Sequence, residues 1–174
     1  MKSLINKIQD IDIHIAFYMT HFYKHHLTNE IMKFISMCGD FGMSWLIVIL
    51  ITNMIDQTRT MSIDMLIALI AATLIGQVTI KSLVRRKRPC HTYPEVQLLI
   101  TTPSDLSFPS GHTTSSFACS TVMMLYNPIL GIIGYIYAIL TAISRLYLFV
   151  HYLSDVVTGV ILGITIGIIT YLLS

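Results

Sequence analysis

The stretch Ser144–Asp155 places an arginine, a histidine and an aspartate at the edge of a very apolar run. Ionisable side chains are costly in such surroundings, so their presence indicates a function. His151 and Asp155 are four residues apart and would share one face of a helix. A carboxylate there can hold one ring nitrogen of His151 and leave the other nitrogen free to react. Taken alone, the pair is equally consistent with a structural contact at a helix end.

A second group, Ser110-Gly111-His112, stands directly before another apolar run. The start of a helix offers free backbone amides and a dipole that favour an anion. Gly111 lets the backbone approach a ligand closely, and His112 can donate or accept a proton. Taken alone, the group is also typical of an ordinary helix cap.

The third group is basic and runs from Lys81 to Arg88, with five of the eleven lysines and arginines of the chain. Lys81 and Arg88 are seven residues apart, so both would point the same way if one helix carries them. The planar fork of arginine matches two oxygens of a phosphate, whereas lysine acts as a point charge. Alone, this group is more typical of a juxtamembrane patch that attracts anionic lipid.

The composition identifies the elements that must position these groups. The 174 residues are 54% hydrophobic and 11% charged, with a mean hydropathy of +0.71, whereas soluble domains carry about 25% charged residues. We therefore predict an all-α, polytopic membrane helical bundle. The formal charge of +2 gives no indication of a nucleic-acid partner.

Five segments approach the length of roughly 20 apolar residues that a bilayer requires. The predicted spans are residues 34–55, most apolar over Gly42–Ile55, then Met61–Val84, 109–126, Ile129–Phe149 and Tyr152–Leu173. Residues 34–174 form the predicted membrane domain, and its long connection, residues 85–108, is the predicted active-site loop.

Residues 1–33 are expected to form an amphipathic helix in the membrane interface, since apolar side chains recur there every three or four positions. Asp10, Asp12 and His14 interrupt this stretch, so no cleavable signal peptide is expected.

Counting the reversals of these spans brings the three groups to one membrane face. The second span ends at the face where the third begins, and the fourth span returns there to deliver Arg145 and His151. Lys81, Arg88 and Arg145, together with a helix start, describe a phosphoryl site. His151 can attack phosphorus and form a covalent intermediate. His112 can protonate the leaving oxygen and later accept a proton from water.

No metal or other cofactor is expected. The predicted face has no carboxylate cluster suited to magnesium. The three cysteines (Cys38, Cys90 and Cys119) are too far apart to resemble a zinc site. Cys38 and Cys119 lie in or beside apolar segments and are expected to be small buried hydrophobic residues, and the sequence assigns no role to Cys90. His21 and His25 have the i, i+4 spacing of a metal pair, but a solvated polar helix face explains them better.

Three motifs give the chain a resemblance to a known family. They are Lys81-x6-Arg88-Pro89, Pro109-Ser110-Gly111-His112 and Ser144-Arg145-x5-His151-x3-Asp155. In this order they resemble the signatures of the type 2 phosphatidic acid phosphatases, which are integral-membrane lipid phosphate phosphatases. The match covers roughly residues 34–173. Many relatives repeat Arg-Pro after the first signature, where this chain has Cys90-His91.

The resemblance implies a bundle of usually six spans, so five to six are expected here. It implies metal-independent hydrolysis through a phosphohistidine, with His151 as nucleophile, Asp155 as its partner and His112 as general acid. The implied phosphate-binding residues are Lys81, Arg88, Ser110, Gly111 and Arg145. It also implies a cell-membrane location, an extracytoplasmic site and a cytoplasmic C-terminus. Soluble acid phosphatases and vanadium haloperoxidases share the signatures, but the apolar spans argue against both.

The function expected from the sequence is hydrolysis of a phosphomonoester or pyrophosphate on a lipid. Undecaprenyl pyrophosphate, phosphatidylglycerophosphate and phosphatidate all fit, and the sequence does not choose between them. The alternative is a catalytically silent membrane protein that binds lipid head groups. A transporter is less favoured, because no inverted repeat is visible. The expected partners are the lipid phosphate and the bilayer, and the sequence does not indicate an oligomeric state.

Overall fold

The computed structural model describes residues 2–174, with side chains from residue 6 onward, and every regular element in that range is helical. This confirms the all-α prediction. The elements are α1 (Lys2–Thr20), a 3-10 turn (His21–Lys24), α2 (His26–Cys38), a 3-10 turn (Asp40–Gly42), α3 (Met43–Asn53), a 3-10 turn (Asp56–Thr58), α4 (Arg59–Ala72), the π-helix η4 (Thr73–Ile80), α5 (Lys81–Val84), α6 (Pro89–Thr92), α7 (Gly111–Tyr126), α8 (Pro128–Tyr147) and α9 (Leu153–Leu173).

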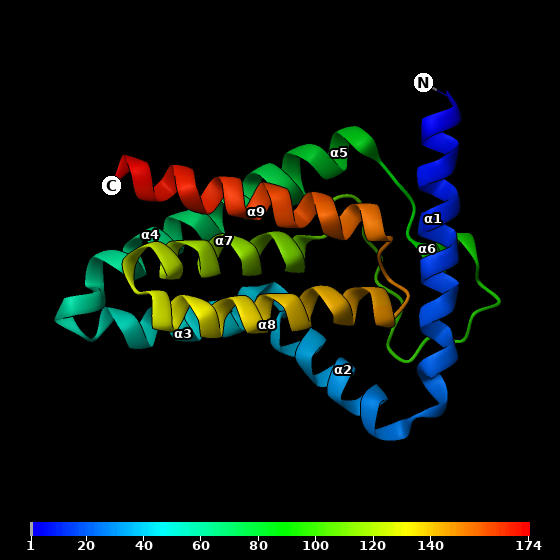
Figure 1. The fold of residues 1–174 in the computed structure, drawn as a ribbon, viewed down its shortest axis with the longest axis horizontal. Helices are drawn as coiled ribbons and strands as arrows, with labels where there is room; N and C mark the ends of the chain where they lie inside the picture. The colour runs from blue at the N-terminus through cyan, green and yellow to red at the C-terminus, as the bar shows by residue number, and fades with distance from the viewer. Residues whose placement is uncertain (1) are drawn as a thin grey trace.

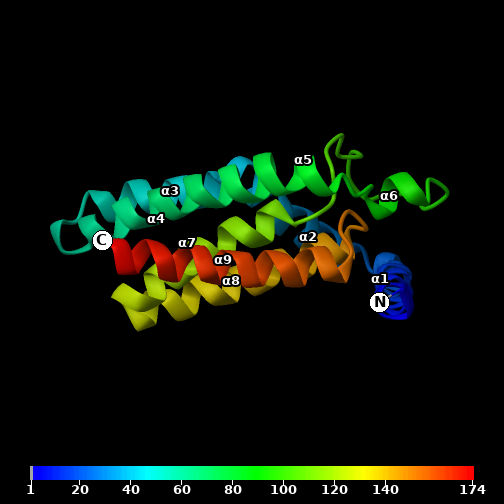
Figure 2. The ribbon, with the colours of Figure 1, turned by 90° about the horizontal axis from the view of Figure 1, so that it is seen from above.

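Helix α7 is the centre of the bundle and packs against α4, α8 and α9. Figure 2 shows it between the layer of α3 and α4 and the layer of α8. Close packing with α9 depends on small residues: a Cβ added at Gly163 would lie 2.5 Å from the carbonyl oxygen of Thr114 and 2.8 Å from Cβ of Phe117. Glycines at every fourth position of α9 therefore let the two helices touch.

Three helical segments in the described part of the chain are long and apolar enough to cross a membrane, namely residues 56–92, α8 and α9. A fourth results if α2 and α3, which are bent by 52° at their junction, count as one span. Residues 34–55, predicted as one span, are therefore divided between two helices with a bend between them. Phe41 and Gly42 adopt positive φ angles of 54° and 68°, which end one helix and start the next.

The predicted third span corresponds to α7, which has 16 residues and is buried along most of its length. Its predicted limits agree with the structure to within two residues. With 16 residues it is shorter than the roughly 20 residues of a typical span. Neighbouring helices cover most of its surface.

Helix α1 lies across the end of the bundle, nearly at right angles to α7, α8 and α9 (Figure 1). It is fixed there by Ala16 and Phe17, which belong to a hydrophobic cluster with Phe149. The amphipathic helix predicted over residues 1–33 is interrupted, because α1 ends at Thr20 and a 3-10 turn leads into α2. The C-terminus of α9 lies at the opposite end of the bundle (Figure 1).

Candidate active site

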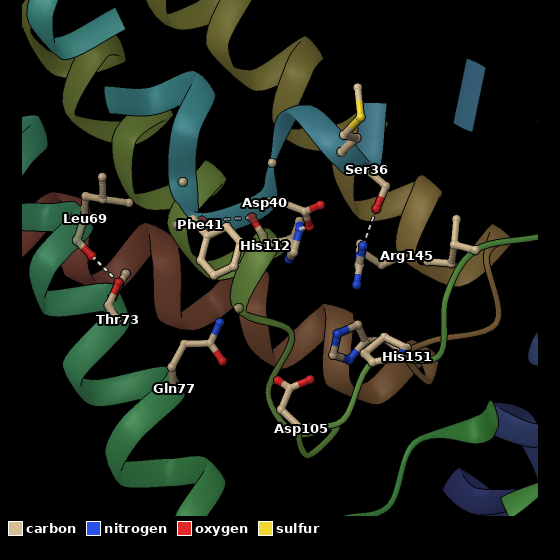
Figure 3. A pocket seen from close by; sticks show the side chains of 18 of the residues that line it. Ser36, Asp40, Phe41, Leu69, Thr73, Gln77, Asp105, His112, Arg145 and His151 are labelled. Carbon is tan, nitrogen blue, oxygen red and sulfur yellow. Dashed lines mark hydrogen bonds and ion pairs between the residues drawn. The ribbon is translucent and has the colours of Figure 1, made fainter. Parts of the chain in front are cut away.

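The three motifs meet around one cavity at the end of the bundle nearest α1. The cavity has a volume of about 1280 Å³. Its lining includes six of the eight residues selected from the sequence: Lys81, Arg88, Gly111, His112, Arg145 and His151. The other two, Ser110 and Asp155, lie behind the wall with no exposed surface. Figure 3 shows His112, Arg145 and His151 around this cavity.

Lys81 and Arg88 are brought together by a carboxylate rather than by a shared helix. The helix ends at Val84, and Arg85 has a positive φ of 53° that turns the chain. Lys81 forms an ion pair with Oδ2 of Asp105, while Nη2 of Arg88 donates to Oδ1 at 2.6 Å. The condition under which both cations would share one helix face is therefore not met, although both line the cavity.

Asp105 remains ionised under ordinary conditions. Burial alone would raise its pKa, but the hydrogen bond from Lys81 and the charge of Arg88 outweigh this and lower the pKa to about 2. The ionised carboxylate of Asp105 therefore pairs with both cations in the place where a bound phosphate could lie.

His151 lies in the turn between α8 and α9 and is 1% exposed. Nη1 of Arg88 donates to its Nε2 at 2.9 Å and to the carbonyl oxygen of Val150 at 2.8 Å. A guanidinium can only donate, so Nε2 must present its lone pair and a neutral ring carries its proton on Nδ1. Burial, followed by the charge of Arg88, lowers the pKa of His151 well below its ordinary value. The ring is therefore neutral.

Asp155 faces the protonated side of this ring, with Oδ2 at 3.6 Å from Nδ1 of His151. That distance is longer than a hydrogen bond. Oδ2 instead accepts from Oγ of Ser107 at 2.5 Å and from the amide of Tyr152 at 2.8 Å. The two residues do not share a helix, since α9 begins at Leu153. The side chains nevertheless meet, because Asp155 folds back over the start of α9 and accepts from the Tyr152 amide.

His112 belongs to the first turn of α7 and is paired with a carboxylate from a distant segment. Its Nε2 lies 2.9 Å from Oδ1 of Asp40, in the break between α2 and α3. Gly39 makes room for the ring, since a Cβ there would lie 2.7 Å from Cδ2 of His112. The bend between α2 and α3 therefore provides both the partner of His112 and the space for it.

Arg145, in the last turn of α8, supplies a cation with unused donors. It is 3% exposed and donates to Oγ of Ser36. Its Nε has no hydrogen-bond partner among the described residues. Because a buried, unpaired donor is costly, the guanidinium of Arg145, which lines the cavity, keeps hydrogen-bonding capacity that a ligand could use after a small adjustment.

Several residues of the site did not emerge from the sequence, namely Ser36, Asp40, Arg86, Asp105 and Ser107. Asp40 had a usable signal, because a carboxylate inside a predicted span is unusual. Arg86 lay in the basic group but could not be distinguished from its neighbours. Ser36, Asp105 and Ser107 stand in segments whose spacing carries no such signal.

The described residues contain no group of three or more His, Cys, Asp or Glu side chains placed to hold a metal ion. His21 donates its Nδ1 proton to the carbonyl oxygen of Phe17 at 3.1 Å. The three cysteines are not disulfide-bonded. Cys119 is buried as expected, whereas Cys38 is only partly buried, and Cys90, for which no role was predicted, is buried as well.

A helical bundle with membrane-spanning segments and a cationic cavity at one end defines a multi-pass membrane protein. The sequence profile of the PAP2 superfamily matches residues 62–174, which is more than half of the chain. The chain therefore belongs to the PAP2 superfamily, and the resemblance inferred from its three motifs is confirmed.

Named relatives are similar over parts of their length. The chain is 42% identical over 102 residues to the decaprenylphosphoryl-5-phosphoribose phosphatase of Mycobacterium tuberculosis, covering 53% of this chain and 50% of that protein. It is 32% identical over 136 residues to the undecaprenyl-diphosphatase of Sulfolobus acidocaldarius, covering 78% of this chain and 65% of that protein. The chain thus spans about half to somewhat under two thirds of the length of these relatives.

A solved structure extends the similarity to nearly the whole chain. The transmembrane PAP2-type phosphatidylglycerolphosphate phosphatase of Bacillus subtilis superposes with a TM-score of 0.80 at 25% identity. The match covers 97% of this chain and 86% of that chain. The similarity therefore includes the N-terminal segment that the sequence motifs leave out.

Proposed function

We propose that this protein is a membrane-embedded lipid phosphate phosphatase that works through a phosphohistidine without a metal ion. The observation that carries the proposal is the neutral ring of His151, whose Nε2 faces the cations of the same cavity. His112 lines that cavity as well. A buried imidazole beside fixed cations suits attack on a phosphoryl group, because the cations stabilise charge on its oxygens.

In the first step, Nη1 of Arg88 releases Nε2 of His151. The freed lone pair then forms a bond to phosphorus while the bond from phosphorus to the leaving oxygen breaks. His112 gives its proton to that oxygen. Asp155, close to Nδ1, stabilises the positive charge that develops on the ring of His151. Lys81, Arg88 and Arg145, with Ser110 and Gly111 at the start of α7, are the proposed phosphate-binding residues.

In the second step, water attacks the phosphorus and His112 takes a proton from it. The phosphorus–nitrogen bond breaks, and its electron pair returns to Nε2 of His151. The products are inorganic phosphate and a lipid alcohol, or a lipid monophosphate when the substrate is a diphosphate. Positive charges of the chain itself replace the metal that many phosphoryl-transfer sites employ.

A lipid substrate is supported by the second wall of the cavity. Beyond the cations, part of the lining is apolar and comes from α2, α3, α4 and η4: Phe34, Leu46, Leu66, Leu69, Ile70 and Leu74. A phosphate at the polar end therefore leaves a hydrocarbon tail beside apolar side chains. The relatives named for polyprenyl phosphates make undecaprenyl pyrophosphate the first substrate to test, with phosphatidylglycerophosphate and phosphatidate beside it.

We further propose five to six membrane passages, with residues 1–33 in the interface and residues 34–174 as the catalytic membrane domain. The orientation of α1 across the bundle supports an interfacial position (Figure 1). In the proposed topology the site, with its loop 85–108, faces outside the cytoplasm and the C-terminus lies inside. Fluorescence of a C-terminal green fluorescent protein fusion tests this, because the fusion folds in the cytoplasm; a dark, translocated fusion contradicts it.

The decisive test measures phosphate release by the purified protein in detergent with a chelator present. We expect turnover of at least one of the three lipids, and loss of turnover in His151→Ala. Acid-labile phosphate should appear on the wild-type chain after rapid quenching and be absent from His151→Ala. Activity that persists in His151→Ala would contradict the mechanism. Tight lipid binding without turnover of any substrate would favour the alternative of a silent head-group-binding protein.

A further inference from the structure

Arg86 joins two buried carboxylates that come from opposite ends of the chain. Its Nη1 donates to Oδ1 of Asp155 at 2.7 Å, and its Nη2 donates to Oδ2 of Asp12 at 2.7 Å. Asp12 is 2% exposed and Asp155 has no exposed surface. The guanidinium lies 4.1 Å from the ring centroid of Tyr152, which adds a cation–π contact. Arg86 is therefore the shared cationic partner of two buried carboxylates and offsets part of the cost of burying them.

Asp12 also fixes the start of α9. Its Oδ1 accepts from the amide of Ser154 at 2.8 Å, and its Oδ2 accepts from Oγ of Ser154 at 2.5 Å. Ser154 is the residue directly before Asp155, and its Oγ also accepts from Nη1 of Arg86 at 2.6 Å. The carboxylate of α1 thus holds the backbone that carries Asp155.

These contacts determine which oxygen of Asp155 faces His151. Because Oδ1 is held by Arg86, the other oxygen, Oδ2, is the one near Nδ1 of His151 and in contact with Ser107. The carbonyl oxygen of Arg86 accepts from the amide of Ser107 at 2.9 Å, so the same residue also places that serine. Asp155 and Ser107 are the two neighbours of Nδ1 of His151. The side chain of Arg86 positions Asp155, and the backbone carbonyl of Arg86 positions Ser107.

We propose that Arg86 is a positioning residue for the reaction and that α1, through Asp12, is a working part of the active site. This inference rests on the proposed function. Arg86 is not among the residues that line the cavity, unlike Lys81, Arg88 and Arg145. It acts on the nucleophile through Asp155 and does not touch the substrate. Its loss should lower kcat and leave KM nearly unchanged, whereas loss of a lining cation should affect both.

The test uses the full chain in detergent, with Arg86→Gln, Arg86→Lys and Asp12→Asn compared with wild type. Arg59→Gln is the matched control, because Arg59 pairs with exposed Asp56 at the far end of the bundle. We expect kcat to fall about 10-fold to 100-fold in Arg86→Gln, the size expected for losing the one charge-assisted hydrogen bond to Asp155. Arg86→Lys should recover part of this, and Asp12→Asn should show a smaller fall. The control should be unchanged.

A double-mutant cycle separates positioning from general weakening of the fold. If Arg86 acts through Asp155, Arg86→Gln should lower kcat little further in an Asp155→Asn background. If the effect is an independent structural one, the fold losses in kcat of the two single variants should multiply in the double variant. Additive losses, a raised KM with unchanged kcat, or full activity in Arg86→Gln would each overturn the proposal.

A second readout does not depend on turnover. In ¹⁵N-histidine spectra, the His151 signals, identified by their absence in His151→Ala, should move in Arg86→Gln and Asp12→Asn and stay in place in Arg59→Gln. Unchanged His151 signals in Arg86→Gln would overturn the positioning role even if the protein is inactive on every lipid tested. Moved signals without turnover of any lipid would support the positioning role and count against the proposed function alone.

Discussion

The guanidinium of Arg88 joins His151 and Asp105, with Nη1 at 2.9 Å from Nε2 of the histidine and Nη2 at 2.6 Å from Oδ1 of the aspartate. The proposed attacking atom and a loop carboxylate thus share one planar fork. A phosphoryl group that takes more than the one unused Nη2 proton of Arg88 must displace an existing partner. Asp105 is the easier to displace, because its side chain is 51% exposed and His151 is buried.

Replacing Asp105 by asparagine should strengthen the binding of anions. The substitution removes the charge that occupies Lys81 and Arg88, so inorganic phosphate should inhibit at roughly fivefold lower concentration, a modest factor because a half-exposed pair is screened by solvent. Inhibition constants for phosphate measured with Asp105→Asn and wild type check this. Glu95→Gln, an exposed acid in the same connection, is the control. An unchanged or raised inhibition constant in Asp105→Asn would show that the carboxylate does not compete.

His151 should make the stability of the protein depend on pH. Its pKa in the folded protein lies well below the ordinary value of 6.5, first because of burial and then because of Arg88. Below pH 6.5 the unfolded chain takes up a proton at this residue and the folded chain does not, so unfolding becomes easier as the pH falls. The melting temperature should therefore decline more steeply between pH 6.5 and 5 in wild type than in His151→Gln. Equal slopes for both proteins would contradict a depressed pKa.

The sequence was sufficient for the motifs and their convergence because both depend on helix periodicity and on counting reversals. Lys81, His112, Arg145 and His151 line one cavity even though details of the argument were wrong. A helix that carried both Lys81 and Arg88 would have aligned the two side chains, but the helix from Lys81 ends at Val84. The three motifs still meet at one end of the bundle, because that depends on the order and direction of the packed helices and not on the local turns.

The partners of these residues could not be predicted, because they depend on tertiary contacts between distant segments. Asp40 reaches His112 only because the helix breaks at Phe41 and Gly42. The spacing of apolar residues does not predict the positive φ angles at these two positions. Asp12 reaches Arg86 only because α1 crosses the end of the bundle. An apolar stripe indicates that a helix is amphipathic, but it does not indicate which buried carboxylate the helix carries to which cation.

The contact between α7 and α9 should be sensitive to a single methyl group. In Gly163→Ala, the new Cβ would lie 2.5 Å from a backbone oxygen of Thr114, which cannot move without shifting α7. We expect destabilisation of about 1–3 kcal/mol, as for other overpacked cores. Gly76→Ala is the control, because its nearest neighbour would lie at 3.7 Å, an ordinary contact. Thermal unfolding in detergent measures both, and equal melting temperatures would mean that the two helices separate at little cost.

Asp40 should matter most for substrates that release a poor leaving group. Its carboxylate, 2.9 Å from Nε2 of His112, stabilises the protonated ring that is proposed to supply a proton to the leaving oxygen. Asp40→Asn should lower kcat roughly 10-fold or more on phosphatidate, whose leaving alkoxide needs that proton, consistent with the size of general acid catalysis. His112 is also proposed to take a proton from water in the second step, which is common to both substrates, so the comparison must use the first step alone. The rate of that step, measured as the burst of released leaving group, should fall much less on p-nitrophenyl phosphate, whose leaving group departs unprotonated.

Glu30→Gln is the matched control for Asp40→Asn, because Glu30 also lines the cavity but pairs with Lys33 on the same helix. Comparing the pre-steady-state rate of leaving-group release for the two substrates in each variant gives the leaving-group dependence of the first step. His112→Ala should show the same selective loss as Asp40→Asn, and the double variant should be little worse than His112→Ala, since both act on one proton. Equal losses on both substrates would assign Asp40 to the folding of the α2–α3 bend instead of to proton transfer.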